Sequence, residues 1–219
     1  MMKSPFINLF PVVLPMLGAL ALGSQQANAQ ETIESWENSL DGWTVEASGY
    51  TAAFSTTTGV TAGLYSLSLT GTAGPNYGQM LESASSTTYT IDLAGASALR
   101  FNVYAPAGSF GGYLQLDVDI NNADAGFVSL DGYSYASATI GGESTISVPI
   151  SSALRNTLAA SANPTTLVIQ VGGGNTTGNE TFYLDNLQVT QVPEPSVAAL
   201  AALGSLGVLV ARKRFARTA

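Results

Sequence analysis

The stretch YLQLDVDI, residues Tyr113–Ile120, decides the fold class. Every second residue in it is Leu, Val or Ile, and Gln115, Asp117 and Asp119 stand between them. Because side chains alternate between the two faces of a β-strand, this pattern predicts a strand with one face in the core and the other in water. We expect Asp117 and Asp119 on the wet face, where acids also discourage unwanted strand pairing.

Short runs rich in Thr, Val, Tyr, Phe and Leu recur along the chain between clusters of Gly, Asn, Ser and Pro. Nine or more strands at this spacing predict an all-β, antiparallel β-sandwich. Ser151–Ala160 is the one expected helix, with Ser151 or Ser152 as its cap and an end before Asn163. The nine expected strands are Trp43–Ala47, Tyr50–Ser55, Leu64–Thr70, Thr87–Leu93, Ala98–Tyr104, Tyr113–Ile120, Thr145–Ile150, Thr166–Val171 and Thr181–Val189.

Residues 30–191 form the expected single domain, whose length suits one hydrophobic core. They contain fourteen acidic residues and two basic ones, Arg100 and Arg155, so their formal charge is −12. A domain this acidic repels nucleic acid phosphates and anionic lipid. Nucleic acid is therefore excluded as a partner, and neutral glycans, cations and basic partners stay as candidate ligands.

The chain has no cysteine and no histidine. It therefore lacks the usual zinc, copper and haem ligands and any Ser-His-Asp or Cys-His centre, so a bound metal would be held by oxygen atoms, with calcium first. Glycoside cleavage needs two carboxylates across a sugar, and among fourteen acids some pair meets that distance by chance. We expect no enzymatic activity, and a glycoside hydrolase ranks third among the candidate functions.

The last 28 residues have the order of a sorting or anchoring segment. An apolar run of fifteen residues gives a helix of about 22 Å at about 1.5 Å per residue, short of the roughly 30 Å hydrocarbon core. A basic flank at 212–217 stays on the cytoplasmic side, which leaves the bulk of the chain outside. A plain C-terminal membrane anchor is one interpretation. The parts, in order, are VPEPS at 192–196, the apolar run at 197–211 and the basic residues Arg212, Lys213 and Arg214.

This order of parts resembles the PEP-CTERM sorting signal of Gram-negative bacteria. The resemblance covers residues 192–219 only, and its motif is Pro193, Glu194 and Pro195. It implies that exosortase, a membrane protease-transferase, recognises the motif and removes the hydrophobic helix. The protein would then be held only briefly in the membrane.

The N-terminus predicts export. Lys3 precedes the mostly apolar stretch Phe6–Leu22, and Ala27-Asn28-Ala29 has the small residues that signal peptidase recognises. Residues 1–29 are therefore an expected signal peptide, with an uncleaved anchor as the alternative. Together the two ends predict passage through the inner membrane, transient anchoring, and delivery to the cell surface or the extracellular space.

Three stretches resemble jelly-roll carbohydrate-binding modules with a galactose-binding-like fold: IESWENSLDGW at 33–43, GLYSL at 63–67 and FYLDNL at 182–187. They occur in the family's order. The resemblance implies a jelly-roll sandwich whose first and last strands lie side by side. It also implies a calcium ion that joins the first and last strands. Its ligands would be Glu37, Asp185 and backbone carbonyl groups of the loop before Tyr65.

The alternative to calcium is a solvent-exposed Glu37 and an Asp185 that accepts hydrogen bonds from backbone amides. A second acidic set, Asp117, Asp119, Asn121 and Asp124, does not match an EF-hand loop, because Asn122 and Val128 occupy the positions that require Gly and Glu. We interpret this set as a solvated acidic edge.

Aromatic rings on which sugars stack, beside amide and carboxyl groups, are typical of glycan sites. If the strand 113–120 lies on the open concave face, Tyr113, Gln115, Asp117 and Asp119 line it. We expect Trp36 and Trp43 in the core. The favoured function is a non-catalytic surface or extracellular-matrix protein associated with exopolysaccharide, and the alternative is a lectin-like module with affinity for a specific glycan.

Overall fold

The computed structural model describes residues 29–71, 78–130, 135–174 and 179–192. Residues Gln30–Val192 form one compact unit. The expected signal peptide at 1–29, apart from Ala29, and the expected sorting signal, apart from Val192, lie outside the described residues. Within the described ranges, no helix is long and apolar enough to cross a membrane.

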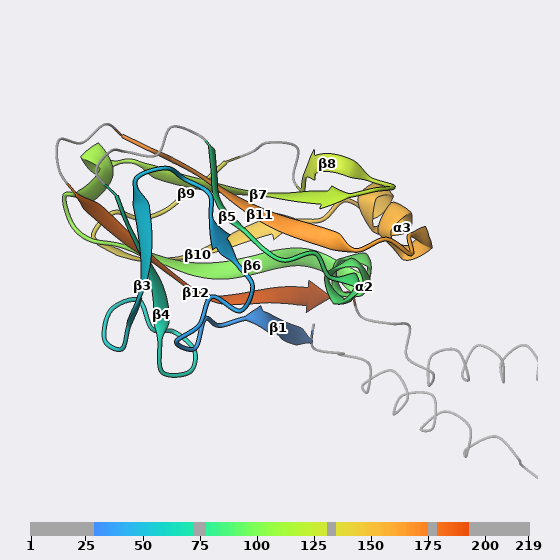
Figure 1. Ribbon diagram of the computed structural model, residues 1–219, viewed down its shortest axis with the longest axis horizontal. Helices are drawn as coiled ribbons and strands as arrows, with labels where there is room; N and C mark the ends of the chain where they lie inside the picture. The colour runs from blue at the N-terminus through green and yellow to red at the C-terminus, as the bar shows by residue number, and fades with distance from the viewer. Residues whose placement is uncertain (1–28, 72–77, 131–134, 175–178, 193–219) are drawn as a thin grey trace, which may run out of the picture. The chain divides into compact units, whose positions relative to one another are not determined.

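Two antiparallel sheets face each other (Figure 1). Sheet A contains the first and last described strands, which pair with each other, as the jelly-roll resemblance implied. Its order is β10 (Gly142–Pro149), β6 (Ala96–Ala105), β12 (Glu180–Gln191), β4 (Ser66–Gly71) and β3 (Tyr50–Ser55), with β1 (Gln30–Glu34) also on β12.

Sheet B has β7 in its interior, between β11 on one side and both β8 and β9 on the other. Its order is β2 (Thr44–Val45), β5 (Gly78–Glu82), β11 (Thr165–Gly173), β7 (Leu114–Asn122) and β8 (Gly126–Ser129), with β9 (Ala136–Ser137) also on β7. The predicted all-β, antiparallel β-sandwich is confirmed.

The core lies between the two sheets. Leu114, Leu116, Val118 and Ile120 of β7 are buried, which confirms the apolar face of the stretch that predicted the fold. Trp36 and Trp43 are also buried, with ring centroids 5.7 Å apart in an edge-on contact. Their prediction as core residues is confirmed.

The described residues contain two α-helices rather than the one expected. The predicted helix at 151–160 is confirmed as α3 (Ser152–Ala160), and the Ser151 side chain accepts the hydrogen bond of its first turn. The predicted strand at 87–93 is wrong, because these residues form α2 (Thr87–Gly95), capped by Ser86. A short 3-10 helix, η1 (Ser109–Gly112), precedes β7.

Tertiary contacts explain α2. Thr90 and Leu93 are its buried residues, three positions apart on one helix face. The Thr90 hydroxyl donates to the Asn163 carbonyl at 2.9 Å, next to the start of β11. β-branched residues favour a strand only where a neighbouring strand is available to pair with them. Here residues 87–95 pack against α3 and the end of the sandwich instead (Figure 1).

Candidate functional site

The candidate site begins on the face of sheet B that points away from the core, here called the outer face of sheet B. On β7 this face carries Gln115, Asp117 and Asp119, because the alternate residues are in the core. The register places Gln170 of β11 opposite Asp117, and Ser137 of β9 opposite Gln115. Side chains from three strands therefore meet on this face.

One end of the face is open. Tyr113, just before β7, is 37% exposed, and its hydroxyl donates to Gln115 Oε1 at 2.5 Å. The Gln115 amide in turn donates to Ser137 Oγ at 3.2 Å. A phenol ring, an amide and a hydroxyl thus stand in a row across β7 and β9.

The two acids of β7 on this face, Asp117 and Asp119, are buried. Asp117 and Asp119 are both 0% exposed, so their expected place on a wet face is wrong. Ser129 Oγ donates to Asp117 Oδ2 at 3.2 Å, and the Gln170 amide donates to Asp119 Oδ2. Hydrogen bonds of this kind offset the cost of removing a carboxylate from water.

A further member of this network, Tyr135, comes from the segment before β9. Tyr135 donates its hydroxyl to Gln170 Oε1 at 2.5 Å, so Gln170 is held between Tyr135 and Asp119. The interpretation of Asp117 and Asp119 as part of a solvated acidic edge is also wrong, since β7 is an interior strand.

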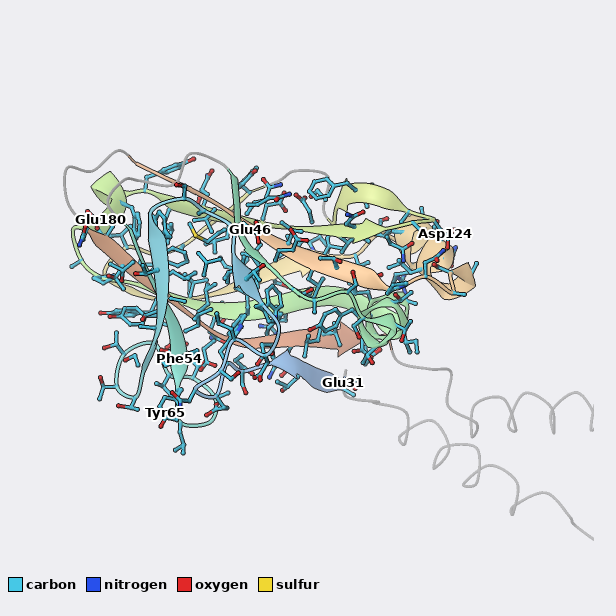
Figure 2. All side chains as sticks on the ribbon, viewed as in Figure 1. Glu31, Glu46, Phe54, Tyr65, Asp124 and Glu180 are labelled. Carbon is cyan, nitrogen blue, oxygen red and sulfur yellow. The ribbon has the colours of Figure 1, made fainter. Side chains whose placement is uncertain are left out.

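Asp124 does not belong to the same cluster. It is exposed in the turn between β7 and β8, and it accepts hydrogen bonds from Ser161 Oγ at 2.5 Å and from the Asn163 amide at 2.9 Å. These bonds lower its pKa below the ordinary value. Figure 2 shows Asp124 at the end of the sandwich that carries α3. Its role is to fasten the loop after α3.

The structure therefore brings Tyr113 and Gln115 together at an open end and places Asp117 and Asp119 in a buried network farther along the same face. The sequence analysis missed Ser137 and Gln170. Gln170 had a signal, since it is the single amide inside the apolar run LVIQV at 167–171. Ser137 had none, because β9 has only two residues.

Glu37 and Asp185 both accept hydrogen bonds from another place, the loop that joins β3 to β4. Asp185 is 0% exposed, and its Oδ2 accepts from the Thr61 amide at 2.5 Å, the Thr61 hydroxyl at 2.9 Å and the Ala62 amide at 2.8 Å. Glu37 is exposed, and its Oε2 accepts from the Leu64 amide at 2.9 Å.

These contacts bear on calcium. The two carboxylates converge on one loop, as the resemblance implied, but the groups they meet there are N–H and O–H donors rather than the carbonyl oxygens that a cation requires. Within the described residues, no three acidic side chains form a group that could hold a metal. The arrangement favours the amide alternative, and calcium at Glu37 and Asp185 stays a prediction.

No protein-family model and no curated protein matches the chain. Among solved structures, it is similar to one from a study of promiscuous specificity in carbohydrate-binding modules of the β-sandwich superfamily, with a TM-score of 0.52 and 17% identity. The match covers 74% of this chain and 62% of that chain. The domain has the fold of a carbohydrate-binding module.

Two further structures of carbohydrate-binding modules from Clostridium thermocellum are similar. A family 11 module in complex with a β-1,3-1,4-mixed-linked tetrasaccharide has a TM-score of 0.49 and 15% identity, over 77% of this chain and 99% of that one. A C-terminal family 22 module has a TM-score of 0.46 and 14% identity, over 75% of this chain and 96% of that one.

Within this carbohydrate-binding-module fold, the three resembling stretches have clear positions. Residues 33–43 run from the end of β1 to the two core tryptophans. Residues 63–67 lead from the β3–β4 loop into β4, and residues 182–187 lie in β12, which pairs with β4. The short motifs thus lie where β1, β12 and β4 pair in sheet A. The outer face of sheet B carries no such motif.

Proposed function

We propose that the domain binds a neutral polysaccharide through the open end of the outer face of sheet B. The observation that carries the proposal is the row of Tyr113, Gln115 and Ser137 on a carbohydrate-binding-module fold. A tyrosine ring offers an apolar surface to a sugar ring, and amide and hydroxyl groups exchange hydrogen bonds with sugar hydroxyls.

The buried network supports the same role. Gln170 is bonded to both Asp119 and Tyr135, and Asp117 is bonded to Ser129. Such bonds make the part of the face next to Gln115 rigid, which lowers the entropy cost of binding. The formal charge of −12 over residues 30–191 disfavours an anionic polysaccharide.

The test is a titration of the purified full-length chain with neutral polysaccharides. We expect Tyr113→Ala to weaken binding by about tenfold, the loss of about 1.4 kcal/mol that is typical of an aromatic anchor. The control is Phe127→Ala, an exposed aromatic residue on β8 at the opposite end of β7. Equal affinity of Tyr113→Ala and the unaltered chain would place the site elsewhere.

The fold supports glycan binding better than the purely structural role that the sequence favoured. Uniformly weak signals on a broad glycan array would restore the structural role, and saturable binding to one sugar class supports the present proposal. Absence of catalysis stays a prediction.

Export stays a proposal as well. It rests on the expected signal peptide and on the PEP-CTERM-like order of residues 192–219, with signal peptidase, exosortase and extracellular polysaccharide as partners. We expect deletion of 193–219 to abolish processing and surface retention in intact cells. Unchanged retention would contradict the sorting role.

A further inference from the structure

The opposite side of the sandwich carries a second aromatic surface. On sheet A the alternate residues of β6 point away from the core, and Tyr104 is directly opposite both Tyr183 of β12 and Glu143 of β10. The Tyr104 and Tyr183 rings are 5.9 Å apart between centroids and tilted by 57°. Both tyrosines are partly exposed, so the pair is a surface feature rather than core packing.

The loop after β3 and the strands β6 and β10 form a pocket on this surface. The loop after β3 comes down onto the sheet at Gly59, where an added Cβ would lie 2.5 Å from Tyr183 Cβ. Only a residue without a side chain permits this approach, and its φ of +71° favours glycine as well. The result is an open pocket of about 380 Å³, lined by Thr57, Thr58, Gly59, Val60, Tyr104 and Glu143.

Hydrogen bonds hold the polar wall of the pocket. The Asn102 amide donates to Glu143 Oε1 at 3.0 Å and to Thr145 Oγ1 at 3.2 Å, and its carbonyl oxygen accepts from Asn186 at 3.4 Å. The opposite wall is held by Ser66, whose hydroxyl donates to the Thr58 carbonyl at 2.6 Å. Both walls are therefore held in place by hydrogen bonds within the chain.

We propose that this pocket, here called the Tyr104 pocket, is a second carbohydrate site that takes one or two sugar units of a neutral polysaccharide. Its volume lies in the range of about 300–1,000 Å³ that is typical of small-ligand sites, and it combines aromatic surface with a few placed polar groups. Threonine hydroxyls would donate and accept hydrogen bonds with sugar hydroxyls, and the Glu143 carboxylate would accept hydrogen bonds from them.

The negative charge at the pocket favours neutral sugars over acidic ones. Glu143 stands at the wall of the pocket, and Arg100 and Arg155 are the only basic residues at 30–191, so an acidic sugar would meet a carboxylate in a strongly negative domain. A neutral chain avoids this repulsion. Since the Tyr104 pocket and the Tyr113 row lie on opposite sheets, one domain would hold two chains at once.

The experiment is isothermal titration of the full-length chain with neutral oligosaccharides of glucose, xylose and mannose. Four variants are compared: Tyr104→Ala, Glu143→Ala, Tyr113→Ala and the control Ser147→Ala, an exposed residue of β10 on the same face outside the pocket. We expect two sites per chain. Tyr104→Ala should weaken one of them by about tenfold, and Ser147→Ala should weaken neither.

The outcomes separate the two proposals. Loss of one site in Tyr104→Ala with retention in Tyr113→Ala supports the Tyr104 pocket even if the Tyr113 row binds nothing. If Tyr104→Ala unfolds, Glu143→Ala decides, because this exposed side chain can be removed without opening the core. Unchanged stoichiometry and affinity in both pocket variants overturns the inference. A positively charged glucosamine polymer is titrated in parallel, and binding of this polymer without binding of any neutral oligosaccharide overturns the inference as well.

Discussion

Asp185 shows how one residue can organise a whole loop. It is fully buried, and its two oxygens accept four hydrogen bonds, three from Thr61 and Ala62 and one from the Asn186 amide at 2.7 Å. Asn186 itself has a φ of +56° at the bulge where the register of β12 shifts. The carboxylate therefore fixes both its own strand and the loop that forms the wall of the Tyr104 pocket.

Replacing this carboxylate should be costly. We expect Asp185→Ala to lower the free energy of unfolding by about 3 kcal/mol, because amides of Thr61 and Ala62 lose a charged acceptor in a buried place. Urea unfolding measures the loss. The matched control is Glu37→Ala, which removes an exposed acceptor of the Leu64 amide and should cost much less. Equal losses in the two variants would contradict the role given to Asp185.

Metal removal tests the same residue in another way. Because amides already occupy the oxygens of Asp185, we expect the melting temperature of the chain to be the same with chelator and with added calcium. A melting temperature that rises with calcium, and does so only while both Glu37 and Asp185 are present, would instead establish the calcium site that the resemblance implied.

Glu34 gives the molecule a pH-dependent stability. Burial raises the pKa of its carboxyl, and the amides of Trp36 and Ser35 act in the opposite direction. A carboxyl with a raised pKa in the folded state favours folding while it is protonated. Its contribution is complete below the ordinary value of 4.5 and is lost as the pH rises through the raised value.

We therefore expect Glu34→Gln to stabilise the protein at pH 7 and to have little effect at pH 4, since glutamine keeps an acceptor for the two amides. Thermal unfolding at both pH values measures the difference. Glu46→Gln is the control, because it removes one negative charge from an exposed position. A stabilisation of the same size at both pH values would contradict the ionisation argument.

At the scale of elements, the two α-helices differ in how much the sequence revealed. α3 has a serine cap and a pattern typical of a helix, and it was predicted within one residue. α2 reads TTYTIDLAG, a composition that favours a strand. It is a helix because its buried Thr90 and Leu93 pack at the end of the sandwich, and no periodicity in nine residues reveals such a partner.

The two serine caps invite a matched test. We expect Ser86→Ala and Ser151→Ala each to lower the free energy of unfolding by about 1 kcal/mol. Each serine side chain accepts a hydrogen bond from a backbone amide in the first turn of its helix, and that amide has no partner within the helix. Chemical denaturation measures both. Serine to threonine at the same positions keeps the acceptor and should restore most of the loss. No loss in Ser86→Ala would mean that tertiary contacts alone hold α2.

The described strands that sequence patterns missed have five residues or fewer: β1, β5, β8 and β9. β5 begins at a glycine, β8 has four residues and β9 has two, so none shows a full alternation of apolar and polar side chains. Their pairing partners define them: β5 adds to β11, and β8 and β9 add to β7. β3, in contrast, was predicted with its exact bounds, because Tyr50, Ala52 and Phe54 alternate along it with the small residues Thr51, Ala53 and Ser55.

At the scale of the whole molecule, the first and last strands of the domain pair with each other in sheet A. β1 pairs with β12 from Gln30–Thr190 to Glu34–Leu187, and the Val192 amide donates to the Gly95 carbonyl at 2.8 Å (Figure 1). The last strand is therefore held by hydrogen bonds to its end, and its Val189 is buried in the core. Glu180 marks the beginning of the same strand in Figure 2.

A pair of truncations tests this pairing. We expect a chain ending at Val192 to unfold at the same temperature as the full chain, because residues 30–192 form one compact unit. A chain ending at Leu187 should be much less stable, since it removes the buried Val189 and the strand pairs of residues 188–191 with β1 and β6. Thermal unfolding measures both. Equal stability of the two truncated chains would contradict the pairing.

The sequence by itself determined the sheet class, the acidic charge and the core of β7, because alternation in a strand is a local property and charge is a sum over residues. Short motifs also located the meeting of the first and last strands. Only the tertiary structure decided that Asp117 and Asp119 are buried, that residues 87–95 are helical, and that Tyr104 and Tyr183 stand side by side. Each of these depends on which strands become neighbours, and that choice is made by contacts between residues far apart in the chain.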